Sequence, residues 1–409
     1  MKYIIILILS CITFSATSAQ HIDLYTWRVQ EGALWQKINQ QKLIPGIHVN
    51  VKVISFDTYQ QHMQLVLQNG RPALFQWAPG AAALAPLLQH TFIEPNEYQL
   101  NNINPSALTA ATATDAKIYG VPFAVQLEGL LVNKKLVNKL GINQRPTSLT
   151  QLESYFSQLK RNQITPLHMA SDDWYLSQVV IEVLMAGLLP AQKATQLISG
   201  ESCFTDPDFI HVLDTLSHWH QSGYLNKNAM TEGYQGAGTN VALANSASVF
   251  DGGWRTSPNS LFYEIDPNFE FEFWAIPGKS NKFYAFADGT YQVNARGRYS
   301  DTAKRVLKFT TTQQFAELFA NELNELPAYS KHMNIKSKNL TALAELVSSQ
   351  GYGVSLFSAA SLNTSEPSYQ TLTRDAIRLI FSGKTGKQAA QSIQKGLNSW
   401  QYVGHKHCA

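Results

Sequence analysis

The stretch from Tyr119 to Asn133 reads YGVPFAVQLEGLLVN, a long, extended and mostly apolar segment. It holds two strongly polar side chains, Gln126 and Glu128. A charged residue inside such an apolar run is unusual without a partner. With 409 residues the chain is also too long for a single hydrophobic core. We therefore expect two lobes and interpret this stretch as a segment that carries the chain from one lobe to the other.

Upstream of this stretch, strand patterns alternate with helical patterns. The expected strands are residues 22–27, 47–54 and 73–77, and the expected helices are residues 31–41, 58–68 and 81–88. This alternation is typical of an α/β lobe with a largely parallel sheet. Ligands of such sheets bind at the carboxyl ends of the strands. Trp27 and Trp77 both fall at such ends.

Downstream of it, helical patterns dominate. We expect helices at residues 148–161, 174–187, 208–222, 300–311, 312–323 and 388–400, and strands at 247–250 and 269–275. Ser148 and Gln151 resemble a capping box at the first of these helices. The glycine cluster from Gly233 to Gly238 lacks the Lys-Ser/Thr ending of a phosphate loop, so we expect a flexible surface turn there. No low-complexity linker occurs, which favours lobes joined by several crossings.

The first nineteen residues predict export. Lys2 precedes an apolar run from Tyr3 to Phe14, and small residues follow up to Ala19. This order is typical of a secretory signal cleaved after Ala19. The residues before Cys11 also resemble a lipoprotein box, so a lipid anchor at Cys11 stays open. We expect a periplasmic protein in either case.

Export would change how many of the three cysteines remain in the protein and how they can pair. Removal of the signal takes Cys11 away and leaves Cys203 and Cys408. In an oxidising compartment two remaining cysteines favour one disulfide. That disulfide would fix the C-terminal tail to the segment around residue 203. Two unrelated free thiols are the alternative.

The composition is that of a large globular protein. Hydrophobic residues make up 44% and charged residues 15%, which gives ample material for a core and no sign of disorder. The 32 basic and 29 acidic side chains leave a net charge of +3. This charge is too weak and too scattered to indicate a partner nucleic acid.

An ordered set of short motifs resembles the family 1 extracellular solute-binding proteins, which include maltose-binding protein and other sugar-binding components of ABC importers. The motifs are Phe75 to Gly80, Tyr119 to Phe123, Asn133 to Leu136, Leu140 to Ile142, Pro146 to Ser148 with Gln151-Leu152, Ile164 to Leu167, Val249 to Trp254, Ile276 to Gly278, Ala303 to Phe309 and Leu326 to Ala328. The turn at Val249 to Trp254 carries one residue more than the family pattern. The resemblance covers nearly the whole chain after the signal.

The resemblance implies an α/β, two-lobed periplasmic binding protein fold (type II) with a three-strand hinge. The implied N-terminal lobe comprises residues 20–125 with 286–326, and the C-terminal lobe comprises 126–285 with 327–409. The lobes would close around a ligand, a known mode of hinge motion. The implied partners are a carbohydrate and an ABC permease in the inner membrane. The protein is expected to be a monomer and no enzyme, with no cofactor and no metal.

Sugars need aromatic faces for their C–H surfaces and planar polar groups for their hydroxyls. The residues that fit these roles, at strand ends, crossings and turns, are Trp27, Glu31, Gln76, Trp77, Gln126, Glu128, Trp174, Asp251, Trp254, Arg255 and Asp288. Arg255 can pair with Asp251 or bind an acidic ligand. Two alternatives to transport remain: a receptor that presents its ligand to a membrane sensor, and a secreted glycosidase with paired carboxylates.

Overall fold

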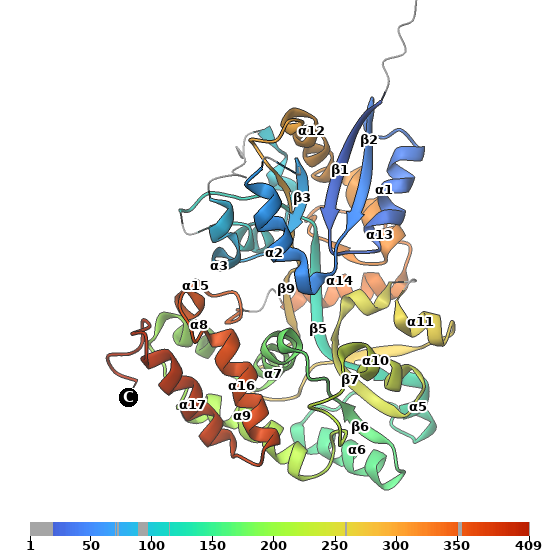
Figure 1. Ribbon diagram of the computed structural model, residues 1–409. Coiled ribbons are helices and arrows are strands. Elements are labelled where there is room, and N and C mark those ends of the chain that lie inside the picture. The colour runs from blue at the N-terminus through green and yellow to red at the C-terminus, as the bar shows by residue number, and fades with distance from the viewer. Residues whose placement is uncertain are drawn as a thin grey trace, which may run out of the picture.

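The computed structural model describes residues 19–69, 71, 73–88, 97–113, 115–257, 260–350 and 354–408. It forms two α/β lobes, one above the other in Figure 1. The predicted signal, including Cys11, lies outside the described residues except for Ala19. None of the helices in the described ranges is long and apolar enough to cross a membrane.

The upper lobe is built on a five-stranded sheet with the order β2-β1-β3-β10-β4 (Figure 1). β1 (Gln20–Thr26) pairs in parallel with β2 (Ile47–Val53) and β3 (Leu74–Trp77), as the alternation of strands and helices predicts. β10 (Thr290–Val293) returns antiparallel between β3 and β4 (Val121–Pro122). The upper sheet therefore combines the start of the chain with a segment from much later in the sequence.

Helices cover this sheet on both sides. They are α1 (Glu31–Gln40), α2 (Phe56–Leu67), α3 (Ala81–Leu84), α4 (Pro105–Ala110), α12 (Ser300–Thr310) and α13 (Gln313–Leu323), with 3₁₀ turns at Ala85–Leu87 and Leu100–Asn102. In α1 the buried side chains Leu34, Trp35 and Ile38 recur at helical spacing on one face. That face packs against β2 and α13. The predicted helices in this lobe are confirmed to within a few residues.

The lower lobe has a six-stranded sheet around β5 (Ala124–Asn133), whose ten residues are all buried. Its other strands are β6 (Thr165–His168), β7 (Ser246–Gly252), β8 (Phe271–Trp274), β9 (Tyr284–Ala287) and β11 (Leu326–Pro327). β7, β8, β9 and β11 all pair antiparallel with β5. The long extended stretch around residue 128 is thus the central strand of this lobe.

The remaining helices surround this second sheet. They are α5 (Lys134–Lys139), α6 (Leu149–Arg161), α7 (Ile181–Leu188), α8 (Ala191–Ser199), α9 (Pro207–Gln221), α10 (Tyr234–Ala242), α11 (Leu261–Ile265), α14 (Lys338–Gln350), α15 (Ala360–Asn363), α16 (Tyr369–Phe381) and α17 (Gly386–Asn398). A π-helical turn, Tyr175–Val180, leads into α7, and a 3₁₀ turn, Gly253–Thr256, follows β7. The helix predicted at 174–187 therefore exists, but its first part is a π-helix.

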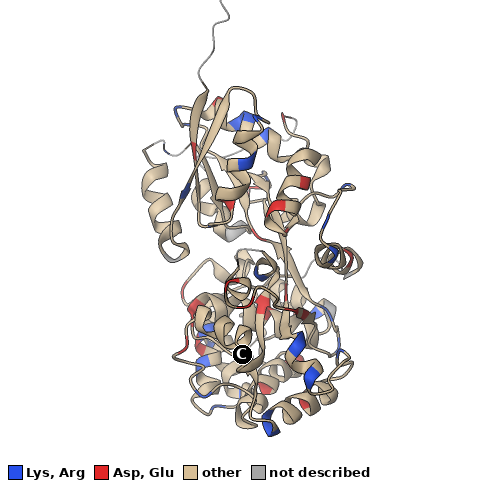
Figure 2. Cartoon of the chain, turned by 90° about the vertical axis from the view of Figure 1, so that its right-hand side faces the viewer, with Lys and Arg blue, Asp and Glu red and all other residues tan. Residues whose placement is uncertain are grey.

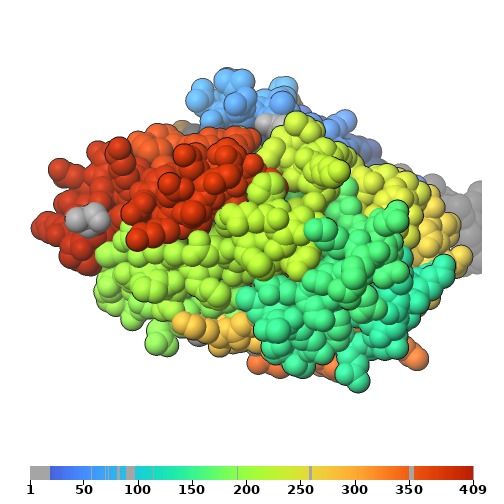
Figure 3. Space-filling view, turned by 90° about the horizontal axis from the view of Figure 1, so that it is seen from below, coloured from blue at the N-terminus to red at the C-terminus, as the bar shows by residue number. Residues whose placement is uncertain are grey.

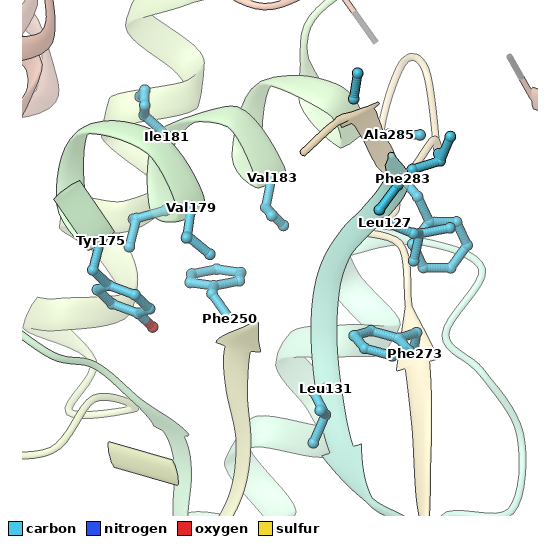
Figure 4. Packing of buried hydrophobic residues seen from close by; sticks show 14 of the residues in the cluster. Leu127, Leu131, Tyr175, Val179, Ile181, Val183, Phe250, Phe273, Phe283 and Ala285 are labelled. Atoms are coloured by element: carbon cyan, nitrogen blue, oxygen red, sulfur yellow. The ribbon is translucent and has the colours of Figure 1, made fainter. Parts of the chain in front are cut away.

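Figure 4 shows the core between the π-helical turn and the central strands. Phe250 of β7 points at Tyr175 and Val179, while Leu127 and Leu131 project from β5. All five side chains are nearly or completely buried. Burial of this kind stabilises the fold by about 25 cal/mol per Å² of apolar surface. It also fixes the π-helical turn against the sheet.

The C-terminal tail is fixed to the middle of the chain. Cys203 and Cys408 form a disulfide across 205 residues of sequence, which confirms the pairing predicted from the cysteine count. Next to it, α17 and α16 pack against α9. In Figure 3 this late part of the chain, coloured red, lies directly beside the yellow-green segment around residue 210.

Two local predictions need correction. The glycine cluster from Gly233 to Gly238 is no flexible turn, because α10 begins at Tyr234 and buries Gly238 against Arg255. The capping box is incomplete. Ser148 Oγ accepts from the Gln151 amide as predicted, but the Gln151 side chain accepts from the Thr147 amide instead of that of Ser148.

Candidate functional site

Three chain segments cross between the lobes and lie side by side. The first runs from β4 into β5, the second from β9 into β10, and the third from α13 into β11. Val125 pairs with both Ala287 and Leu326, and Pro122 pairs with Thr290. This is the three-strand hinge that the family resemblance implies. The candidate site lies where these crossings meet the ends of the strands of the upper sheet.

A buried arginine connects two of the crossings. Arg28 follows the end of β1 and is buried. Its Nη1 donates to Asp288 Oδ2 (2.6 Å) and its Nη2 to Glu325 Oε2 (2.7 Å). Gln126 Nε2 donates to the same two oxygens, at 3.2 Å and 2.9 Å. Asp288 belongs to the second crossing, Glu325 to the third and Gln126 to the first. We call Arg28, Glu31, Gln126, Asp288 and Glu325 the hinge cluster.

Two members of the hinge cluster, Arg28 and Asp288, have shifted pKa values. Burial lowers the pKa of Arg28, but the carboxylates of Glu325 and Asp288 outweigh it, so this pKa lies above its ordinary value. Burial raises the pKa of Asp288, and Arg28 opposes that rise. The Arg28 guanidinium also lies 4.9 Å from the centroid of the Phe123 ring, which provides a cation–π contact. Three carboxylates around one guanidinium leave this cluster with excess negative charge.

Glu31 and Gln76 support the cluster from inside the upper lobe. Glu31 is fully buried, and its two oxygens accept from Arg28, Gln76, the Trp35 indole and the Tyr291 hydroxyl. Gln76 also accepts from the Thr26 hydroxyl. Both were predicted as ligand contacts. Because their polar atoms are already satisfied within the protein, the structure places them behind the site and not at its surface.

Trp77 lies in a different place from the one predicted. Alternation along β3 puts Trp77 and Phe75 on the same side of the sheet, where they join Met63 and Leu84 in a core cluster under α2 and α3. Trp77 is 1% exposed, and its indole N–H donates to the carbonyl of Ala83 (2.7 Å). The expectation that Trp77 contacts the ligand therefore does not fit its buried position.

The other three predicted tryptophans meet between the lobes and are partly exposed. Trp27 contacts Phe56 of α2, with ring centroids 6.0 Å apart, and Phe56 contacts Trp174 of the lower lobe at 6.2 Å. Trp174 contacts Tyr234 at 4.8 Å, and the Trp254 indole N–H donates to the Tyr234 hydroxyl (2.6 Å). A chain of aromatic rings thus links Trp27 of one lobe with Trp254 of the other.

Asp251 and Arg255 form a pair within the lower lobe. Arg255 Nε donates to Asp251 Oδ2 (2.8 Å), and the Tyr234 hydroxyl donates to Asp251 Oδ1 (2.7 Å). Arg255 also lies over the Tyr234 ring, 4.2 Å from its centroid. Both charged side chains are buried. Their internal pairing positions the turn that carries Trp254.

Glu128 lies deeper in the lower lobe and is not exposed at all. Gln178 Nε2 approaches its Oε1 at 3.4 Å, while no described group bonds its Oε2. Burial, aided by the carboxylates of Glu182 and Asp251, raises the pKa of Glu128 well above its ordinary value. Burial beneath Gln178 therefore favours the protonated form of the Glu128 side chain.

The structure thus brings Trp27, Trp174, Trp254 and Asp288 to the space between the lobes and sets the other candidates behind them. Sequence reasoning missed Arg28, Glu325, Phe56, Tyr234 and Gln178. Arg28 directly follows Trp27, and Glu325 directly precedes the predicted third crossing, so their positions beside predicted features were a usable signal. Phe56 offered no such signal. Among the described residues no group of His, Cys, Asp and Glu side chains suits a metal ion.

Comparison with known proteins identifies the family of the chain. The family model described as bacterial extracellular solute-binding protein matches residues 26–317. The chain belongs to this family. Its members are binding proteins and not enzymes. No curated protein matches the sequence of this solute-binding protein.

Solved structures share the two-lobed fold along nearly their whole length. A chitin oligosaccharide binding protein has a TM-score of 0.76 at 19% identity, covering 93% of this chain and 98% of its own. The protein RafE in complex with raffinose has a TM-score of 0.75 at 18% identity, with coverages of 94% and 100%. A sugar transporter from Bacillus licheniformis in complex with stachyose has 0.68 at 16% identity, with coverages of 94% and 99%. At sequence identities this low, the structural similarity establishes the fold of this solute-binding protein but does not establish its ligand.

Proposed function

We propose that this solute-binding protein is periplasmic, captures a carbohydrate between its lobes by closing at the hinge, and delivers it to an ABC importer. The observation that carries the proposal is the meeting of three partly exposed tryptophans, Trp27, Trp174 and Trp254, from both lobes. Such rings provide flat apolar area for the C–H faces of sugar rings. Several proteins of this fold are described as complexes with raffinose or stachyose, which supports the same ligand class.

Hinge closure is part of the proposal. The lobes are proposed to divide as residues 20–125 with 286–326 and residues 126–285 with 327–409, so that the three crossings form the only covalent links between them. Closure needs a ligand that binds the closed form more tightly than the open one. Trp27 and Trp254 come from different lobes, so a sugar held between them would supply that difference.

The test is calorimetry on the full mature chain with a panel of mono- and oligosaccharides. We expect at least one carbohydrate to bind, and the change Trp254→Ala to weaken it by roughly tenfold, or about 1.4 kcal/mol. Trp400→Ala is the matched control, because Trp400 is also partly exposed but donates to the Pro367 carbonyl near the C-terminal tail. If no carbohydrate binds, or if both variants weaken binding equally, the proposal is wrong.

A further inference from the structure

Among the described residues, the candidate site holds charged side chains in the hinge cluster and in the Asp251–Arg255 pair. Both signs of charge are scattered over the molecule in Figure 2, so the local arrangement at the hinge cluster and at Arg255 decides what a ligand meets. These two places hold the buried arginines of the candidate site, Arg28 and Arg255.

Arg28 is buried and surrounded by carboxylates of the protein. Its Nε donates to Glu31 (3.3 Å), while its Nη1 and Nη2 donate to Asp288 and Glu325. The side chain is 4% exposed and lies between the rings of Phe123 and Phe319. Each nitrogen of the guanidinium thus already donates a hydrogen bond to a carboxylate of the protein.

Arg255 is turned away from the space between the lobes. Its Nε pairs with Asp251 and its Nη1 donates to Gln235 (3.2 Å). Its Nη2 lacks a partner among the described residues. This nitrogen faces the backbone of α10, since a Cβ built on Gly238 would lie 3.2 Å from it. An acidic ligand between the lobes would therefore not meet a free guanidinium there.

Asp288 is the carboxylate of the hinge cluster that a ligand can reach. Its side chain is 18% exposed, whereas those of Glu31 and Glu325 are fully buried. Arg28 and Gln126 both donate to its Oδ2, and no described residue donates to its Oδ1. Two donors on one oxygen fix the carboxylate and leave the other oxygen to accept from a ligand.

We propose that this site selects its ligand by charge, accepting neutral carbohydrates and carbohydrates with a protonated amine while rejecting uronic acids. The inference rests on the proposed function and names the ligand class of the same site. A ligand carboxylate about 4 Å from Asp288 would be repelled by it, and more strongly than in water because the dielectric near a protein surface is lower. An ammonium group at the same distance would be attracted for the same reason.

The test is a thermal-shift screen followed by calorimetry on the full mature chain with carbohydrates of three charge classes. The neutral class contains raffinose and oligomers of N-acetylglucosamine, the cationic class glucosamine oligomers, and the acidic class oligomers of galacturonate and glucuronate. We expect the tightest ligand to be neutral or cationic and the uronates to bind at least tenfold more weakly, or about 1.4 kcal/mol. Uronates that bind as tightly or more tightly would overturn charge selection while leaving carbohydrate binding intact. Absence of binding in all three classes would overturn the proposed function itself.

The variant Asp288→Asn then links the selectivity to one residue. It is expected to narrow the difference in affinity between the tightest ligand and the uronates, because it removes the carboxylate that meets the ligand. The matched control is Asp301→Asn, an exposed aspartate in the first turn of α12. A difference in affinity that Asp288→Asn leaves unchanged, or that Asp301→Asn changes equally, would overturn the role of Asp288.

Discussion

The hinge cluster and the Asp251–Arg255 pair both bury charged side chains, but they differ in their balance of charge. The pair is balanced, with one carboxylate and one guanidinium four residues apart in the sequence. The hinge cluster sets one guanidinium against three carboxylates, two of which come from 260 and 297 residues further along the chain. A local, balanced pair can stabilise a turn within one lobe. In the long-range, unbalanced cluster, Arg28 donates to carboxylates of the second and third crossings, and Gln126 of the first crossing donates to the same two carboxylates.

The change Arg28→Met is expected to have the largest effect. It removes the only cation of the hinge cluster and leaves Glu31, Asp288 and Glu325 buried together without compensation. Breaking buried ionic contacts in this way costs about 3 to 5 kcal/mol. Urea unfolding followed by tryptophan fluorescence measures the loss, and a change below that of Asp251→Asn would contradict the central role of Arg28.

The change Asp251→Asn is expected to have an intermediate effect. It leaves Arg255 buried with one neutral partner, and the loss of a charge-assisted hydrogen bond costs about 2 to 3 kcal/mol. In the hinge cluster the same chemical change, Asp288→Asn, relieves repulsion among three carboxylates and should cost less than about 1 kcal/mol. Both variants are compared by the same urea unfolding. Equal losses would show that the excess of carboxylates at the hinge has no energetic consequence.

Glu182 is a third example of a buried ionisable group. Its carboxyl group has no ion pair to any described cation. Its Oε1 accepts from the amide of Phe357 (2.8 Å), and burial raises its pKa from 4.5 to about 8. The folded state therefore favours the protonated form. Its contribution to stability is complete below the unfolded pKa of 4.5 and falls as the pH rises towards 8.

The change Glu182→Gln removes this titration. We expect the free energy of unfolding to decline less steeply between about pH 4.5 and 8, with a difference in slope of up to about 1.4 kcal/mol per pH unit. Urea unfolding at a series of pH values measures both slopes. Glu322→Gln, on the outer surface of α13 and paired with Lys37, serves as the control. Parallel profiles for wild type and Glu182→Gln would contradict the raised pKa.

Local patterns in the sequence were enough for part of the fold, although they did not predict the short strands β9, β10 and β11. The alternating runs around β1, β2 and β3 predict a largely parallel sheet, and the apolar stretch around residue 128 predicts a crossing into a second lobe. Both follow from short-range periodicity and length. The pairing of Asp251 with Arg255 could also be anticipated, because four residues separate the two side chains. The disulfide followed from the count of cysteines and from export.

The positions of side chains relative to the ligand could not be derived in this way. Trp77 and Trp254 look alike in the sequence, each next to an apolar strand, yet Trp77 is buried under α2 and Trp254 is partly exposed between the lobes. The direction of a side chain at a strand end depends on which helix covers which face of the sheet. Packing between segments that are distant in the sequence determines which helix covers which face.

By itself, the sequence predicted two α/β lobes from chain length and from alternating strand and helix patterns, and it favoured the disulfide from the cysteine count. The second and third crossings were implied by the family resemblance. Only the tertiary structure decided that Arg28 would donate to Asp288 and Glu325, that Glu128 would be buried with a raised pKa, and that aromatic contacts would link Trp27, Trp174 and Trp254. The contacts of Arg28 with Asp288 and Glu325 join residues 260 and 297 positions apart. Their energy depends on burial and on neighbouring charge, and both exist only once the chain has folded.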